Sequence, residues 1–92
     1  MDDQHTGFPK YIGDGECYAA KITFVETRDF PEMPGCLFVL LGDVGKEMTV
    51  MPKWARENNP EVGGYFVIRN GIVGAQFIPA GDFESRFTKV GE

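Results

Sequence analysis

The sequence predicts an α+β domain that is mainly β, with about five antiparallel strands, one short helix and a C-terminal helix. Short segments of alternating or continuous hydrophobicity recur along the chain, which is typical of strands. Glycine, asparagine and proline separate these segments at the spacing of turns. Two stretches, 52–58 and 79–89, carry helix signals instead. We expect the strands to form a curved sheet or a small open barrel.

The chain of 92 residues has room for one domain. Hydrophobic residues make up 42% of it and aromatic residues 13%, which excludes the class of disordered chains. Residues 1–9 lack periodicity and read as a flexible tail. Residues 10–92 are therefore expected to form a single small globular domain.

The first strand is predicted over residues 16–27, after a turn at 13–15. Thr, Ile, Phe and Val favour the extended state. Two alternating faces are available, and the one with Tyr18, Ile22 and Phe24 is the better candidate for the core.

Residues 28–35 are predicted to form a loop, because two prolines within four residues oppose a regular ladder. Phe30 and Met33 on this loop either fold back on the core or stay exposed as a contact patch. The run 36–41 is apolar on both faces, which indicates a central buried strand. Residues 47–51 alternate and read as its hairpin partner.

A short helix over 52–58 is predicted because its first residue is proline, which fits the first turn of a helix. Trp54 could anchor this helix on the sheet. Residues 65–69 and 72–78 are predicted strands, joined by Asn70-Gly71 in a type I′ hairpin.

The terminal helix is predicted over 79–89 from one apolar stripe, in which Phe83 and Phe87 are four residues apart and Val90 follows three later. Acidic residues near its start and basic residues near its end suit the helix dipole.

No catalytic, cofactor-binding or metal-binding residues can be assigned, and we expect a chain that is not an enzyme. His5 is the one histidine and lies in the predicted tail, whereas nucleophilic catalysis needs an oriented imidazole. Cys17 and Cys36 with this distant histidine do not make a zinc ligand set. Both cysteines lie in strand patterns and read as buried structural thiols, with a disulfide or a reactive thiol as alternatives. The sequence contains neither of the glycine-rich motifs that bind phosphate groups, G-x-G-x-x-G and G-x-x-x-x-G-K-[ST].

The formal charge is −5, from 14 acidic and 9 basic residues. The basic residues are scattered, which argues against direct nucleic-acid binding. An acidic surface could instead keep the protein in solution, meet a basic partner or mimic DNA. The longest apolar run, 36–41, is far shorter than the ~20 residues that span a bilayer, so no membrane association is expected. The acidic N-terminus lacks a signal-peptide pattern, so we expect a cytoplasmic location.

One sequence pattern resembles known proteins. It runs Pro60-x-x-Gly63-Gly64-Tyr65-x-Val67-x-x-Asn70-Gly71, then Phe77-Ile78-Pro79-x-x-x-Phe83-Glu84-x-x-Phe87, with an opening Lys10-Tyr11-Ile12-Gly13. This pattern resembles the C-terminal half of small phage and prophage proteins of unassigned function. The chain departs from it in lacking the usual tryptophan in the strand after the turn, and residues 16–59 match no pattern that we can place. The resemblance implies a bacteriophage or prophage setting and no particular activity.

These observations favour a phage or prophage accessory protein that acts as a non-catalytic protein-binding module, for example by inhibiting a host factor or defence system. The partner would be a host or phage protein. The sequence also leaves open that the chain forms a homodimer. The expected contact residues are Phe30, Met33, Trp54 and Arg56, because loops on a rigid sheet carry function and Trp and Arg are enriched at interfaces. The alternative is a structural or assembly component of a virion, which would pair through edge strands. A small enzyme or nucleotide binder would need a pocket with converging polar groups. The location would be the cytoplasm of an infected or lysogenic bacterium, or the virion.

Overall fold

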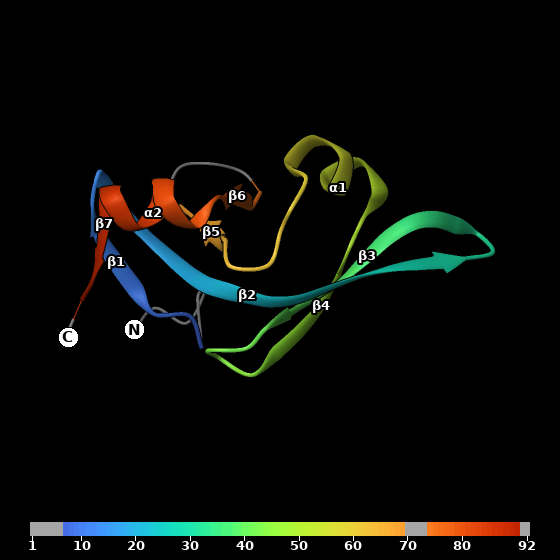
Figure 1. The fold of residues 1–92 in the computed structure, drawn as a ribbon, viewed down its shortest axis with the longest axis horizontal. Coiled ribbons are helices and arrows are strands. Elements are labelled where there is room, and N and C mark those ends of the chain that lie inside the picture. Colours follow the sequence, from blue (N-terminus) through green and yellow to red (C-terminus); the bar gives the residue numbers. More distant parts are fainter. Residues whose placement is uncertain (1–6, 70–73, 91–92) are drawn as a thin grey trace.

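The computed structural model describes residues 7–69 and 74–90. Within these residues, seven antiparallel strands form one open sheet, and two short helices lie against it (Figure 1). The elements are β1 (Lys10–Gly13), β2 (Gly15–Phe30), β3 (Met33–Leu41), β4 (Lys46–Val50), α1 (Pro52–Asn58), β5 (Tyr65–Ile68), β6 (Gln76–Ile78), α2 (Ala80–Arg86) and β7 (Phe87–Lys89). The predicted class, mainly β with two helices and an antiparallel sheet, is confirmed, and the sheet is open.

Strand β2 is the spine of the sheet, because it takes part in both halves (Figure 1). Its first residues pair with β1 and β5, and its residues 22–30 pair with β3. The remaining order places β7 beside β1, β4 beside β3, and β6 beside β5. A register shift between Ile22 and Phe24 marks where β2 passes from one half to the other. The shift leaves Thr23 as an extra residue in β2, and an extra residue of this kind bends a strand and increases its twist.

Two buried clusters lie on opposite faces of β2 and β5, since neighbouring residues such as Ala19 and Ala20 belong to different clusters. The aromatic core contains Tyr11, Cys17, Ala19, Tyr65, Val67, Ile78, Phe83 and Phe87. The second cluster contains Ala20, Ile22, Val39, Leu41, Val50 and Phe66. In the aromatic core, Phe83 stacks on Tyr65 with ring centroids 4.1 Å apart and on Phe87 at 4.8 Å. Aromatic pairs in these geometries add to the stabilisation from buried area.

The predicted short helix is present as α1, with proline in its first turn. It ends at Asn59, which has a left-handed φ of 48° and donates its backbone N–H to the Ala55 carbonyl oxygen. Asparagine tolerates this conformation, and the following proline prevents continuation of the helix. Trp54 anchors α1, because its ring lies 5.5 Å from the Phe66 ring.

The predicted loop over 28–35 is wrong. Strand β2 continues to Phe30, and β3 already begins at Met33, so that these two residues pair across a tight turn. The prolines are tolerated because Pro31 lies in the turn and Pro34 lies in an irregular stretch where the register shifts. Proline is compatible with a strand at such irregularities, where no ladder hydrogen bond is required of it.

The predicted terminal helix over 79–89 is too long. Helix α2 ends at Arg86, and Phe87–Lys89 form β7, which pairs with β1. The stripe that predicted a continuous helix does bury Phe83 and Phe87, but Val90 is 46% exposed. The free edge of β1, an element that the sequence analysis did not predict, offers hydrogen bonds that a further helical turn would forgo.

The predicted core face of β2 is also partly wrong. Ile22 is fully buried, whereas Tyr18 is half-buried and Phe24 is 45% exposed. The register shift between Ile22 and Phe24 turns Phe24 away from the face that carries Ile22, which simple alternation cannot anticipate.

Three further predictions concern the strand at 36–41, the hairpin at 65–78 and the tail at 1–9. In β3, Cys36, Val39 and Leu41 are buried, and the residues between them are half-buried, so the second face is only partly covered. Strands β5 and β6 pair as predicted, but the Asn70-Gly71 turn lies outside the described residues, as do residues 1–6 of the predicted tail. Phe8 packs edge-on against Phe66 with centroids 6.2 Å apart.

Candidate functional site

The outer halves of β2 and β3 form an arm that extends beyond the two helices (Figure 1). We define the arm as residues 23–38. Strand β5 pairs with β2 only as far as Lys21, with two more backbone hydrogen bonds at Ile22. Within the part of the chain that the structure describes, residues 24–30 therefore have β3 as their one strand partner. Backbone N–H and C=O groups along a strand edge of this kind can pair with another chain.

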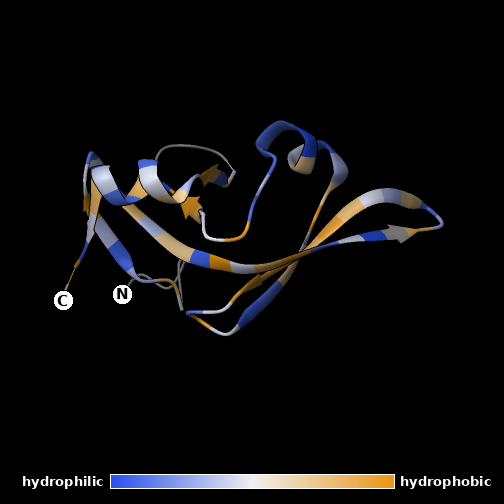
Figure 2. Cartoon of the chain, viewed as in Figure 1, coloured by the Kyte–Doolittle hydropathy of each residue, from blue (hydrophilic) through white to orange (hydrophobic). Residues whose placement is uncertain are grey.

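Large apolar side chains are exposed along this arm. Phe24 is 45% exposed, Phe30 is 44% exposed and Met33 is 41% exposed. Phe30 and Met33 therefore do not fold back on the core, which leaves the alternative of exposure. Figure 2 shows hydrophobic and hydrophilic segments interspersed toward the tip of the arm.

The face of the arm that carries Phe24 is ordered by ring contacts. The Phe24 and Phe38 rings meet edge-on with centroids 6.2 Å apart. The Arg28 guanidinium lies 4.4 Å from the centroid of the Phe38 ring, and its Nη2 is 3.5 Å from Glu26 Oε1. Aromatic rings beside an arginine are the residue types that dominate binding energy at protein interfaces.

Trp54 lies in a second apolar region, between α1 and the sheet. A groove of about 200 Å³ is lined by Val50, Met51, Trp54, Phe66 and Ala75. Met51 at its rim is 48% exposed, whereas Trp54 is half-buried. The groove is too small for a drug-sized ligand, which occupies about 300 Å³ or more, but is large enough for one apolar side chain.

Trp54 is also a structural anchor, because its Nε1 donates a hydrogen bond to the Ala75 carbonyl oxygen at 2.8 Å. Arg56 lies on the exposed side of α1 and forms no ion pair with another described residue. Of the two, Arg56 is exposed and Trp54 is half-buried.

The arm and α1 meet near the start of β3, close to the turn at the tip of the arm. A Cβ atom added to Gly35 would lie 3.5 Å from Pro52 Cβ, which places the start of the helix against this strand. Gly35 follows Met33 closely in β3, so the start of α1 lies near the tip of the arm. The predicted contact residues therefore come from two neighbouring parts of the fold, the tip of the arm and α1.

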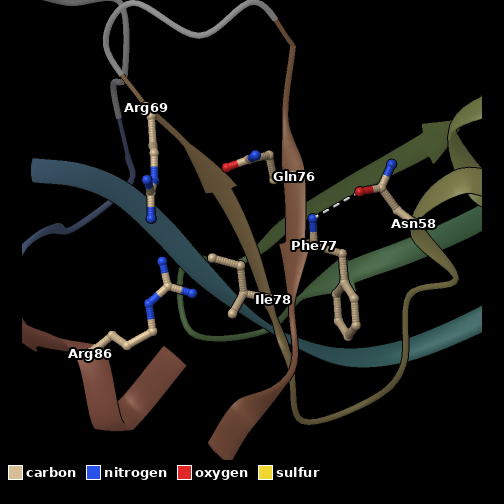
Figure 3. A pocket seen from close by; sticks show the side chains of 6 residues that line it. All are labelled: Asn58, Arg69, Gln76, Phe77, Ile78 and Arg86. Atoms are coloured by element: carbon tan, nitrogen blue, oxygen red, sulfur yellow. Dashed lines mark hydrogen bonds between the residues drawn. The ribbon is translucent and has the colours of Figure 1, made fainter. Parts of the chain in front are cut away.

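A third region is polar and was not predicted from the sequence. A cavity of about 230 Å³ is lined by Asn58, Arg69, Gln76, Phe77, Ile78 and Arg86 (Figure 3). Its two arginines come from the end of β5 and the end of α2, 17 positions apart in sequence, and no motif spacing links them. In the sequence, Arg86 could be read only as a helix-terminal cation.

The two cysteines lie in the interior of the fold. Cys17 and Cys36 are free and buried, and burial raises the pKa of the Cys17 thiol even though Arg69 and Arg86 act to lower it. Among residues 7–69 and 74–90, no group of three or more His, Cys, Asp or Glu side chains is placed to hold a metal ion. In the same residues, neither helix has the length and apolar character to cross a membrane.

Comparisons with protein-family models, with curated proteins and with solved structures find no match to this chain. Function is therefore inferred from the side chains and strand edges that the fold exposes.

Proposed function

We propose that this chain is a phage or prophage accessory protein that acts as a non-catalytic protein-binding module, and that the arm is its main contact surface. The observation that carries this proposal is the exposure of Phe24, Phe30 and Met33 on a strand pair with an open edge. The apolar side chains would supply binding energy, and the edge of β2 would supply backbone hydrogen bonds to the partner.

The arm is suited to this role because it extends from a rigid base. Strand β2 is held in the sheet by β1 and β5 before the arm begins. A binding element fixed in this way loses little conformational entropy when it binds, which favours affinity.

The groove beside Trp54 supports the same function as a secondary contact. One apolar side chain of the partner could enter it next to the exposed Met51. Arg56 on the outer side of α1 would then lie at the rim, where a charge affects the association rate more than the affinity.

The phage or prophage setting rests on the resemblance of residues 60–87 and of the opening at 10–13. A host factor or a component of a defence system is the class of partner that such a setting favours. The bacterial cytoplasm would be the place of action.

A pull-down tests the proposal. The tagged full chain is incubated with bacterial lysate, with and without nuclease, and bound proteins are identified by mass spectrometry. We expect an abundant host protein that survives nuclease treatment and is lost with a Phe30→Ser, Met33→Ser double variant. Val62→Ser is the matched control, since Val62 is an apolar residue outside the arm and is 62% exposed. Retention of the same host protein by the arm variant would overturn the role of the arm.

The second candidate, a structural or assembly component of a virion, is favoured by the same open edge of β2. Small β domains pair with copies of themselves through such edges. Sedimentation over a range of concentrations separates the two functions. A ring or filament that the arm variant abolishes would favour assembly, and a monomer or dimer would favour the binding module.

A further inference from the structure

The polar cavity concentrates positive charge in a protein whose formal charge is −5. Figure 3 shows the guanidinium groups of Arg69 and Arg86 pointing toward each other from β5 and α2, with Gln76 on the same side. Both cations lie near one ring, at 5.2 Å and 5.4 Å from the centroid of Phe87. Two like charges held together repel each other unless an anion lies nearby.

One carboxylate already balances one of these arginines. Arg86 donates from Nε at 3.2 Å and from Nη2 at 2.9 Å to Oδ2 of Asp14. The Asp14 backbone N–H in turn donates to the Arg86 carbonyl oxygen at 3.1 Å, so this pair is fixed at both main chain and side chain. Arg86 is therefore a positioned, charge-paired wall of the cavity.

Arg69 is not balanced in the same way. Among the described residues it forms no ion pair, and its Nε is buried without a hydrogen-bond acceptor. A buried donor without an acceptor costs about 1–3 kcal/mol, and more when the group is charged. The stacking on Phe87 stabilises the cation without supplying that acceptor.

The remaining wall of the cavity is preorganised. The Asn58 side chain accepts a hydrogen bond from the Phe77 backbone N–H at 3.2 Å and donates one to the Trp54 carbonyl oxygen at 3.1 Å. Asn58 thereby ties α1 to β6 at the edge of the cavity (Figure 3). Gln76 adds an amide that can donate to an oxygen ligand.

From this geometry we infer that the cavity between Arg69 and Arg86 binds the carboxylate group of a small molecule or of a peptide. Two guanidinium groups and one aspartate leave a single uncompensated positive charge, which one carboxylate neutralises. The planar fork of an arginine matches the two oxygens of a carboxylate. The cavity volume of about 230 Å³ limits the bound part to a few heavy atoms. This inference does not rest on the docking function of the arm.

The first experiment titrates the protein with sodium acetate at constant ionic strength. The NMR signals of the backbone amides and of the arginine Nε–H groups report binding. We expect saturable shifts of the Arg69 and Arg86 signals with a dissociation constant in the millimolar range, and no response to acetamide, the neutral analogue. Equal shifts with chloride would overturn the site. A response to inorganic phosphate but not to acetate would overturn the assignment to a carboxylate.

A second set of titrations identifies the source of the carboxylate. Propionate represents a free small acid, and a short peptide with an amidated C-terminus and one glutamate represents an acidic side chain. Tighter binding of the peptide assigns the site to a protein partner, and equal or weaker binding assigns it to a free acid. Failure of both, together with acetate, would overturn the inference.

Variants check which side chains act. Arg69→Gln should remove the response to acetate, and Arg69→Lys should weaken it severalfold because lysine lacks the fork. Arg28→Gln is the matched control, since Arg28 also covers a phenylalanine ring but lies on the arm.

Asp14→Asn gives an independent test, because the expected result is a gain in acetate affinity and not a loss of binding. The Asp14 side chain is 65% exposed, so the variant should fold. Removing this competing carboxylate should tighten acetate binding about threefold or more at low salt. Unchanged or weaker binding would contradict the charge balance on which the inference depends.

Discussion

The indole Nε1 of Trp54 donates a hydrogen bond to the Ala75 carbonyl oxygen at 2.8 Å, and this bond ties α1 to the segment that leads into β6. Trp54→Phe keeps the ring contact with Phe66 but leaves the carbonyl without this donor. We expect a loss of about 1 kcal/mol in the free energy of unfolding for Trp54→Phe. Trp54→Ala also removes the ring contact and should cost about 2–4 kcal/mol. This loss is smaller than that expected for a fully buried tryptophan, because Trp54 is half-buried.

Urea denaturation of both variants measures these values. An alanine variant that is as stable as the unchanged chain would show that Trp54 is not a structural anchor. A stable phenylalanine variant that loses partner binding would assign the indole N–H to the interface.

The second prediction concerns pH and the phenol of Tyr65, which donates to Glu84 Oε2 at 2.9 Å. Burial, followed by the interaction with Glu84, raises the pKa of Tyr65 well above its usual value of 10. The folded chain thus holds this proton more tightly than the unfolded chain. Its contribution to stability is present below pH 10 and is lost as the pH rises above 10.

Tyr65→Phe removes this contribution and should cost about 1 kcal/mol at pH 7. Above pH 10, the free energy of unfolding should fall more steeply for the unchanged chain than for the variant. Parallel pH profiles in this range, measured by chemical denaturation, would show that the phenol ionises equally in both states.

The third prediction uses two glycines that differ in their surroundings. A Cβ atom on Gly64 would collide with the Phe77 ring and lie 3.0 Å from the Ile78 carbonyl oxygen. Gly64→Ala should therefore cost about 1–3 kcal/mol through overpacking. Gly81, in α2, has no atom within 4 Å of an added Cβ. Gly81→Ala should raise stability by up to about 1 kcal/mol, and thermal unfolding of both variants gives the comparison.

The fourth prediction concerns the two thiols. Cys17 and Cys36 are each 1% exposed, and the Cys36 Sγ lies 3.4 Å from the Met33 carbonyl oxygen. Both should react with a thiol reagent many times more slowly in the folded chain than in urea, since the thiolate must form and be reached. Rapid labelling of either residue in the native protein, located by mass spectrometry, would contradict the burial of that cysteine.

The local signals in the sequence predicted most elements correctly. Proline at the start of α1 and the alternation in β4 each act within a few residues, so the sequence reveals them directly. The failures depend on distant partners. The shift at Ile22 and the conversion of Phe87–Lys89 into β7 follow from pairing with β3 and β1, which no short window contains.

The same distinction applies to the candidate sites. The exposed Phe30 and Met33 could be named from the sequence because they flank a proline-rich turn. The proximity of Arg69 and Arg86 could not be predicted from the sequence, because only the fold brings the end of β5 close to the end of α2.

Site-specific photo-crosslinking from the arm tests the central claim most directly. The full chain, with a photoreactive phenylalanine analogue in place of Phe30, is expressed in bacterial cells and irradiated. A chain with the same analogue in place of Val62 is the control. The account predicts one dominant crosslinked partner from position 30 and none from position 62. No crosslink from position 30, or the same set of products from both positions, would contradict the arm as the binding surface.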